Sequence, residues 1–287
     1  MNIAVLGAGL IGRPMAERLK TMGHAVTVYN RTREKVVDLR HQGIAVTTRP
    51  EEALQAASCV ILMLADAQAI HKVVLSGPAH ARLAGRTVIQ MGTIGPGESR
   101  DLQDRIVAAG GEYLEAPVLG SITEAKAGTL SIMAGARPDQ FHRWQEVLRC
   151  FGPTPRLIGP VGSAAALKLS LNHLIAAHIA AFSLSLGLVQ RAGVPVDIFM
   201  AVLRDSALYA PAFDKKLPRL LNRDYANPNF STKHLLKDVE LVLHEAQTIG
   251  LHTSVIEGVR TVLQLTMQRG LEDVDYSALF EAIHPAG

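Results

Sequence analysis

Lys168 is the only formally charged residue in the stretch 157–190, and Asn172 follows it four positions later. On a helix this spacing places both side chains on one face. A lysine near a helix start often extends its ammonium group to water. If Lys168 instead faces a closed cleft, desolvation would lower its pKa from about 10.4 toward neutrality, where a general acid works well. The pair is therefore a candidate for proton transfer, with Asn172 orienting either the lysine or a substrate oxygen.

A glycine-rich turn follows the first apolar run of the chain. Gly7, Gly9 and Gly12 have the spacing G-x-G-x-x-G, between a strand-like and a helix-like segment. There the first glycine permits a tight turn, the second lets backbone approach a pyrophosphate, and the third allows close helix packing. The helix N-terminus adds free N–H groups and a partial positive charge. We therefore predict a dinucleotide-binding loop that consists of Gly7, Ala8, Gly9, Leu10, Ile11 and Gly12.

The end of the second strand-like segment indicates which dinucleotide binds. An NAD site usually has an acid there for the ribose 2′-hydroxyl. This chain has Asn30, Arg31 and Thr32, and its next acid, Glu34, already lies in the following helical segment. Arg31 can bind a 2′-phosphate through two charge-assisted hydrogen bonds, with Asn30 and Thr32 as neutral donors. We therefore predict NADP(H) as the cofactor.

Other chemical sites are not supported by the spacing of their residues. His173 and His178 are five positions apart, so on a helix they do not share a face as zinc ligands would. Cys59 and Cys150 form neither a disulfide framework nor a metal-binding pattern. No serine has both a nucleophile-elbow glycine pattern and an assignable base. We predict no metal site.

The elements that must position these residues change in kind near residue 160. Strand-like runs occupy 3–6, 25–29, 59–64, 87–90 and 130–134, and helix-like segments occupy 13–22, 33–41 and 97–109. This alternation predicts parallel β-α-β units in an α/β, doubly wound sheet. After Pro160 the pattern is helical. We therefore predict a dinucleotide-binding domain over 1–160 and an all-helical substrate and dimerisation domain over 161–287.

Composition excludes several classes of protein. The chain has 287 residues, 48% of them hydrophobic and 19% charged, which excludes intrinsic disorder. A net charge of +3 without a run of basic residues makes nucleic-acid binding unlikely on physical grounds. The first apolar run is broken by glycines before it reaches signal-peptide length. The uncharged stretch 169–190 contains asparagine, histidines and serines, so we expect a buried core helix of a cytoplasmic protein, not a membrane span.

Several separated motifs, in order along nearly the whole chain, resemble the β-hydroxyacid dehydrogenases. They are the glycine turn, the segment 23–32, Glu115-Ala116-Pro117-Val118-x-Gly120, Gly128-Thr129-Leu130, Gly162-x5-Lys168-x3-Asn172, Lys237-Asp238 and the segment 275–278. The resemblance implies a Rossmann domain joined by a long helix to a helical domain, in homodimers or homotetramers. It also implies that Lys168 is the catalytic acid and base, with Asn172 beside it. Met63, Leu64, Ala65, Thr93 and Lys237 match positions that contact the cofactor.

Two positions depart from the family pattern. Leu119 stands where relatives usually have a serine that holds the substrate carboxylate, and a leucine cannot donate a hydrogen bond. Ser121, or the backbone N–H groups of Gly120 and Ser121, would have to bind the anion instead, unless the substrate is less polar. Leu171, where relatives often carry an asparagine, also makes the pocket more apolar.

The resemblance implies NADPH-dependent reduction of a small aldehyde or keto acid to the hydroxyacid, or the reverse. One alternative is C=N reduction, as in the related imine reductases. Those enzymes generally lack this lysine, so Lys168 argues against that reading, while Leu119 favours it weakly. A second alternative is a non-catalytic NADP-binding protein. Apart from a small-molecule substrate and further copies of the chain, we expect no partner, neither nucleic acid nor membrane.

Overall fold

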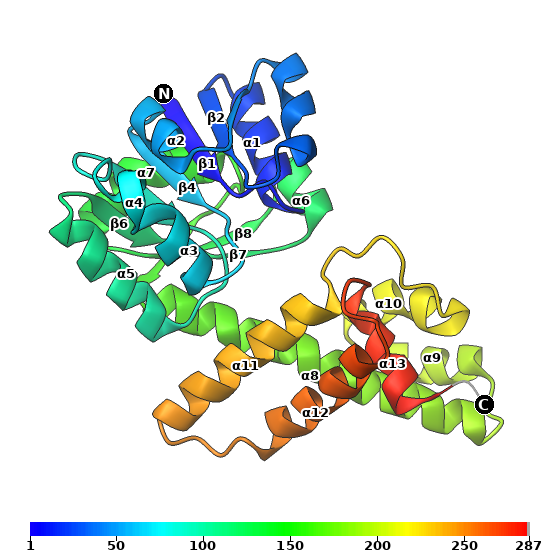
Figure 1. Cartoon of the computed structure of the whole chain (residues 1–287). Helices are drawn as coiled ribbons and strands as arrows, with labels where there is room; N and C mark the ends of the chain where they lie inside the picture. Colours follow the sequence, from blue (N-terminus) through cyan, green and yellow to red (C-terminus); the bar gives the residue numbers. More distant parts are fainter. Residues whose placement is uncertain (286–287) are drawn as a thin grey trace. The chain divides into compact units, whose positions relative to one another are not determined.

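The computed structural model describes residues 1–285, and the chain divides into two compact units within helix α8 (Ser163–Arg191) (Figure 1). The first unit is Met1–Leu169, and the second begins at Ser170. The division thus lies inside α8, whereas the expected boundary at 160 precedes it. The first turns of α8 belong to the first unit because they are hydrogen-bonded to it, as shown below. Residues 286–287 of the expected second domain lie outside the described residues.

The first unit contains a sheet of nine strands with the order β3-β2-β1-β4-β5-β6-β8-β7, and β9 pairs with β8. The first six are β1 (Asn2–Leu6), β2 (Ala25–Tyr29), β3 (Ala45–Thr47), β4 (Cys59–Leu62), β5 (Thr87–Gln90) and β6 (Glu112–Glu115), and they are parallel. Strands β4 and β5 are buried along their whole length, as expected for a sheet covered on both faces. The order 3-2-1-4-5-6 is that of the Rossmann fold, so the predicted doubly wound sheet is confirmed.

Three further strands extend the sheet beyond β6. They are β7 (Val118–Leu119), β8 (Ser131–Gly135) and β9 (Arg156–Gly159). Strand β8 runs antiparallel to β6 and β7 and parallel to β9. The run expected at 130–134 is therefore a strand, in an antiparallel addition to the parallel sheet.

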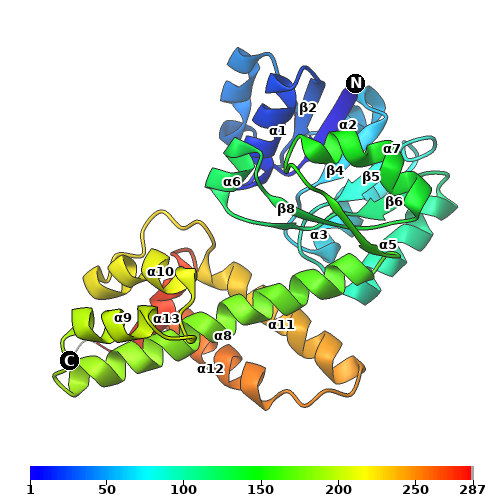
Figure 2. The ribbon, with the colours of Figure 1, turned by 180° about the vertical axis from the view of Figure 1, so that it is seen from behind.

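Helices cover both faces of this sheet, as views from opposite sides show (Figures 1 and 2). One buried cluster contains residues of α1 (Gly12–Thr21), α6 (Ile122–Ala127) and α7 (Pro138–Arg149). The other contains residues of α2 (Pro50–Ala56), α3 (Ala67–Val74) and α5 (Pro96–Ala108), beside the short α4 (Gly77–His80).

The helix expected over 33–41 is instead a pair of 3₁₀ helices, η1 (Arg33–Lys35) and η2 (Val37–Gln42). Val36 separates them with an extended φ of −136°, a value that an α-helix does not allow. Arg13 of α1 holds the segment by donating hydrogen bonds to the Lys35 carbonyl at 3.2 Å and to Asp38 Oδ1 at 3.1 Å.

The second unit is helical throughout its described residues, apart from one isolated bridge between Ser231 and Asp275. It contains the rest of α8, α9 (Val196–Arg204), α10 (Pro211–Asn222), α11 (Thr232–Thr248), α12 (Ser254–Gln268), η3 (Tyr276–Ala278) and α13 (Leu279–Ile283). Phe182 and Phe213 stack in its core with ring centroids 4.6 Å apart. Lys216 of α10 forms a buried ion pair with Asp275, with Nζ 2.7 Å from Oδ1.

Helix α8 is long and apolar enough to cross a membrane by length and composition alone, with a mean hydropathy of 1.5 in its most apolar window. Only 39% of that window is buried. One face, with Ala176, Ile179 and Leu186, is buried in the second unit, whereas Leu184 and Leu188 are exposed. The expectation of a buried core helix therefore holds for one face of α8 and is wrong for the other.

Candidate functional site

The four predicted cofactor-binding segments lie at one edge of the sheet, because each follows the carboxyl end of a parallel strand. They are the glycine loop 7–12 after β1, the loop 30–32 after β2, the loop 63–65 after β4 and the loop 91–93 after β5. The strand ends are aligned, since Leu6 pairs with Tyr29 and Leu62, and Leu62 pairs with Gln90. The strand order reverses between β1 and β4, and such a switch point is where doubly wound folds bind ligands.

The glycine loop has the shape that a pyrophosphate requires. Gly7 has φ +99°, and a Cβ there would lie 2.4 Å from the Met63 carbonyl oxygen, while one on Gly12 would lie 2.0 Å from the Gly7 carbonyl oxygen. A Cβ on Gly9 would meet no described atom within 4 Å. The first and third glycines are thus required by the fold, whereas the space at Gly9 suits a ligand. Helix α1 has no acid in its first turn and no side-chain cap, so its N-terminus can accept an anion.

Asn30 connects the glycine loop to the loop after β2. Its Oδ1 accepts a hydrogen bond from Ala8 N at 3.3 Å, and its Nδ2 donates to the Thr32 carbonyl at 2.7 Å. The structure therefore uses Asn30 to hold the two loops together, where the sequence suggested a donor to a phosphate. Arg31 is exposed at the end of β2, as its predicted role requires.

The loops after β4 and β5 contact each other beside the glycine loop. A Cβ on Gly92 would lie 2.9 Å from the Leu64 carbonyl oxygen. The buried Gln90 side chain fixes this turn, because Gly92 N donates to Gln90 Oε1 at 2.7 Å and Gln90 Nε2 donates to the Gly92 carbonyl at 3.1 Å. Thr93 follows and is half-buried. Gln90 was missed in the sequence, although a polar residue ending a buried strand is a usable signal.

The segment 119–121 leads from the end of β7 into α6. Leu119 is half-buried, and Gly120 has φ +141°. The N–H of Ser121 donates to Glu124 Oε2 at 2.7 Å, and its hydroxyl donates to the same oxygen. The N–H and the hydroxyl of Ser121, two of the donors that were expected to compensate for Leu119, are thus bound to a carboxylate of the chain itself.

Lys168 lies on α8 within the first unit and is 8% exposed. Helix α8 begins at a buried carboxylate, that of Glu115 at the end of β6. Glu115 Oε1 accepts hydrogen bonds from the N–H groups of Gly162 and Ala164, each at 2.8 Å, and of Ala165 at 3.1 Å. Lys168 therefore comes one turn after a helix start that is fixed to the sheet.

Asn172 lies on the part of α8 that belongs to the second unit, where it is buried against α11. Its Nδ2 donates to Asp238 Oδ2 at 2.6 Å, and Lys237 Nζ lies 2.8 Å from Asp238 Oδ1. Asn172 Oδ1 accepts no hydrogen bond from any residue in the range 1–285. Asp238 therefore orients Asn172 and leaves a buried acceptor oxygen, which suits a donor such as an ammonium group or a substrate hydroxyl.

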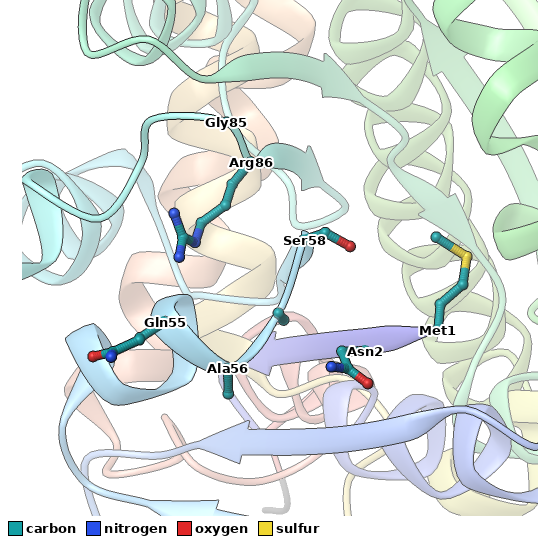
Figure 3. Close-up of a pocket in the computed structure, with 8 residues that line it drawn as sticks. Met1, Asn2, Gln55, Ala56, Ser58, Gly85 and Arg86 are labelled. Carbon is teal, nitrogen blue, oxygen red and sulfur yellow. The ribbon is translucent and has the colours of Figure 1, made fainter.

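A shallow depression with a volume of about 560 Å³ lies at the opposite, amino-terminal edge of the sheet (Figure 3). It is lined by Met1, Asn2, Gln55, Ala56, Ala57, Ser58, Gly85 and Arg86. The Arg86 guanidinium donates to the Leu54 and Ala84 carbonyls. The lining has no carboxylate, histidine or lysine, so we do not assign the chemistry to it.

Residues 1–285 hold no group of three or more His, Cys, Asp or Glu side chains that could bind a metal ion. Cys59 and Cys150 are both free and buried. Burial raises the pKa of the Cys59 thiol to about 12, so it is a poor nucleophile.

Comparisons with known proteins agree with this geometry. A family model described as the NAD binding domain of 6-phosphogluconate dehydrogenase matches residues 2–159. Another, described as NAD-binding of NADP-dependent 3-hydroxyisobutyrate dehydrogenase, matches residues 162–283.

Among relatives, glyoxylate/succinic semialdehyde reductase 1 of Arabidopsis thaliana is 30% identical over 99% of this chain and 98% of that protein. The 2-hydroxy-3-oxopropionate reductase of Escherichia coli is 27% identical over 99% of this chain and 97% of its own length. The crystal structure of 3-hydroxyisobutyrate dehydrogenase from Salmonella typhimurium has a TM-score of 0.88 at 21% identity, covering 98% of this chain and 99% of that one. At that identity the structure supports the fold alone.

Proposed function

Because the chain belongs to the β-hydroxyacid dehydrogenase family of NAD(P)-binding oxidoreductases, we propose that it transfers a hydride between NADP(H) and a small aldehyde or keto acid, with Lys168 as general acid and base. One observation supports this most directly. The glycine loop and the loops after β2, β4 and β5 meet at one sheet edge, and the nearly buried Lys168 lies in the same compact unit.

The residues of this edge fit a nicotinamide dinucleotide. The backbone of the glycine loop and the first turn of α1 would hold its pyrophosphate. Arg31 would hold the 2′-phosphate, because no acid lies between Tyr29 and Arg33 to repel it. The loops at 63–65 and 91–93 would border the nicotinamide, and Lys237 is a further candidate for a cofactor contact. When bound, the cofactor supplies the hydride chemistry.

The proton is the part of the reaction that the chain itself supplies. In the reducing direction, the Lys168 ammonium donates a proton to the oxygen of the substrate as that oxygen becomes an alkoxide. In the oxidising direction, neutral Lys168 removes the proton from the hydroxyl. Asn172, oriented by Asp238, offers its Oδ1 to the ammonium or to the hydroxyl.

The first test compares Lys168→Ala with Lys215→Ala, an exposed lysine on α10. We expect the former to lower kcat by about 10²- to 10⁴-fold, the usual contribution of a general acid, with unchanged NADPH affinity. Lys215→Ala should behave as the unsubstituted enzyme. The assay follows NADPH oxidation with glyoxylate, succinic semialdehyde, uncharged aldehydes and cyclic imines. Near-normal turnover of Lys168→Ala would refute the assignment, and turnover of imines alone would favour C=N reduction.

The cofactor preference has its own test. Arg31→Ala should raise the KM for NADPH by about 10- to 100-fold, the value of charge-assisted hydrogen bonds, and leave the KM for NADH unchanged. Arg40→Ala, an exposed arginine outside the loop after β2, is the control. An equal loss with both cofactors would mean that Arg31 does not distinguish them. NADPH binding without turnover of any compound would instead favour a non-catalytic protein.

A further inference from the structure

We propose that Glu115 is a positioning residue of the reaction, whose side chain fixes the start of α8 and thereby the place of Lys168. The inference rests on the proposed function, because it takes Lys168 to be the general acid. Glu115 lies at the end of β6, far from Lys168 along the chain, and is only 1% exposed.

Both carboxylate oxygens of Glu115 accept hydrogen bonds. Oε1 accepts three backbone hydrogen bonds from the start of α8, from Gly162, Ala164 and Ala165. Oε2 accepts the hydroxyl of Ser99 on α5, which in turn lies 2.8 Å from the Tyr113 hydroxyl. One side chain thus joins the sheet, helix α5 and helix α8. Three of the N–H groups that a helix start leaves without internal partners are satisfied by this one oxygen.

Two glycines make room for the Glu115 carboxylate and for the chain that it binds. Gly135 of β8 is paired with Glu115, and a Cβ on Gly135 would lie 2.3 Å from Glu115 Oε1. Gly162 has φ +99°, which turns the chain into α8 with its N–H toward the carboxylate. The first turn of α8 is therefore tied directly to the Glu115 carboxylate.

Lys168 is close enough to the first turn of α8 for its position to depend on the hydrogen bonds of Glu115. It comes three residues after Ala165, a rise of about 4.5 Å along the helix axis. A shift or rotation of the first turn is transmitted to the lysine, because a helix is stiff over so short a distance. Displacing a reacting group by about 1 Å can lower the rate by roughly 100-fold. Glu115 would act on the reaction through the geometry of Lys168, without touching the substrate.

The substitutions Glu115→Gln and Glu115→Ala distinguish the effect of the hydrogen bonds of Glu115 from the effect of its charge. Glutamine can keep its Oε1 on the three N–H groups and donate through Nε2 to Ser99, so we expect a kcat close to that of the unsubstituted enzyme. Alanine removes the acceptor of the three N–H groups and leaves Ser99 only its contact with the Tyr113 hydroxyl, so we expect kcat to fall by about 100-fold. NADPH affinity should be unchanged, because the glycine loop is not involved. The control is Glu112→Gln, on the same strand but in a half-exposed pair with Arg143.

A double-mutant cycle tests whether Glu115 acts through Lys168. In a Lys168→Ala background, we expect Glu115→Ala to cost little further activity. The isotope effect on kcat from NADPH deuterated at the transferred position should also rise in Glu115→Ala, because hydride transfer becomes slower than the other steps.

Equal losses of kcat with and without Lys168 would overturn the inference and leave Glu115 a purely structural role. An unchanged kcat in Glu115→Ala would overturn it as well. If Glu115→Ala does not bind NADPH and is therefore unfolded, Glu115→Asp replaces it, since its carboxylate is one methylene too short to reach the N–H groups. If Lys168→Ala alone keeps its turnover, the proposed function fails, whatever Glu115 does.

Discussion

At the scale of single residues, Glu124 occupies hydrogen-bond donors of the segment that was expected to bind a substrate carboxylate. Its Oε2 accepts hydrogen bonds from both the N–H and the hydroxyl of Ser121, next to the apolar Leu119. A second carboxylate brought to this segment would meet a like charge and find both donors of Ser121 occupied. Like charges a few ångströms apart in a partly solvated site repel by about 1 to 4 kcal/mol.

We therefore expect Glu124→Gln to raise kcat/KM for succinic semialdehyde relative to an uncharged aldehyde of similar length, by about fivefold if the lower of these energies applies. The ratio of the two kcat/KM values is the measured quantity, because it cancels any general loss of activity. Glu112→Gln, at the start of β6, is the control. A ratio that does not change in Glu124→Gln would show that the segment 119–121 does not face the substrate carboxylate.

The residues that could be predicted from the sequence are those whose partners are close along the chain. The glycine loop is one case, because the spacing of its three glycines predicts the conformation of the loop. Gln90, Glu115 and Asp238 were not assigned roles, since what they do depends on packing. Glu115 binds N–H groups about fifty residues later, and Asp238 binds Asn172 from another helix. A pattern of neighbouring residues in the sequence cannot predict a contact between such distant segments.

At the scale of elements, the sequence predicted the buried parallel strands well, because continuous apolar runs of this length are typical of them. It did not predict β3, β6, β7 or β9, which are short or carry charged residues. The 33–41 segment has helix-forming residues, but the contacts of Arg13 hold it as two 3₁₀ turns. Tertiary contacts thus override local propensity here.

The start of α8 is an element whose stability depends on pH. Burial raises the pKa of Glu115 above its ordinary value, against the hydrogen bonds of Ser99 and the three N–H groups, which lower it. Tyr113, the titratable group beyond Ser99, has its pKa raised by burial and stays neutral. An acid with a raised pKa in the folded state binds more protons there than when unfolded. The contribution of Glu115 to the free energy of unfolding is therefore complete below the pKa that this group has in the unfolded chain. It is lost as pH rises through the higher pKa of the folded state.

Glu115→Gln resembles the protonated acid at every pH, so it serves as the reference. We expect the Tm of the unsubstituted protein to fall relative to that of Glu115→Gln as pH rises from about 5 to 8. Calorimetry at several pH values in one ionic strength measures the difference. The opposite trend would show that the four hydrogen bonds outweigh burial, and that the carboxylate is ionised in the fold at low pH.

At the scale of the whole molecule, the second unit has an apolar surface that its own core does not use. Leu184 and Leu188 of α8 are 64% and 71% exposed, and Val202 of α9 is 67% exposed. Each pair Leu184–Leu188 and Ile198–Val202 is spaced by four residues and lies on one helix face. Phe182 of α8 stacks on Phe199 of α9 with ring centroids 6.3 Å apart, whereas Leu184 and Leu188, about 200° and 240° further around α8, lie on the face turned away from α9. An exposed apolar surface of this kind commonly marks a protein interface.

We therefore expect the exposed face of α8 with Leu184 and Leu188 to form the interface of a homodimer or homotetramer. Leu184→Glu combined with Leu188→Glu would place two charges on this face, and burying them unpaired would shift the assembly to monomers. Sedimentation velocity at several concentrations measures the change. Val107→Glu, a 54% exposed position on α5 of the first unit, should leave the mass unchanged. A monomeric unsubstituted protein would contradict the assembly itself, whereas an unchanged oligomer in the double variant would place its interface elsewhere.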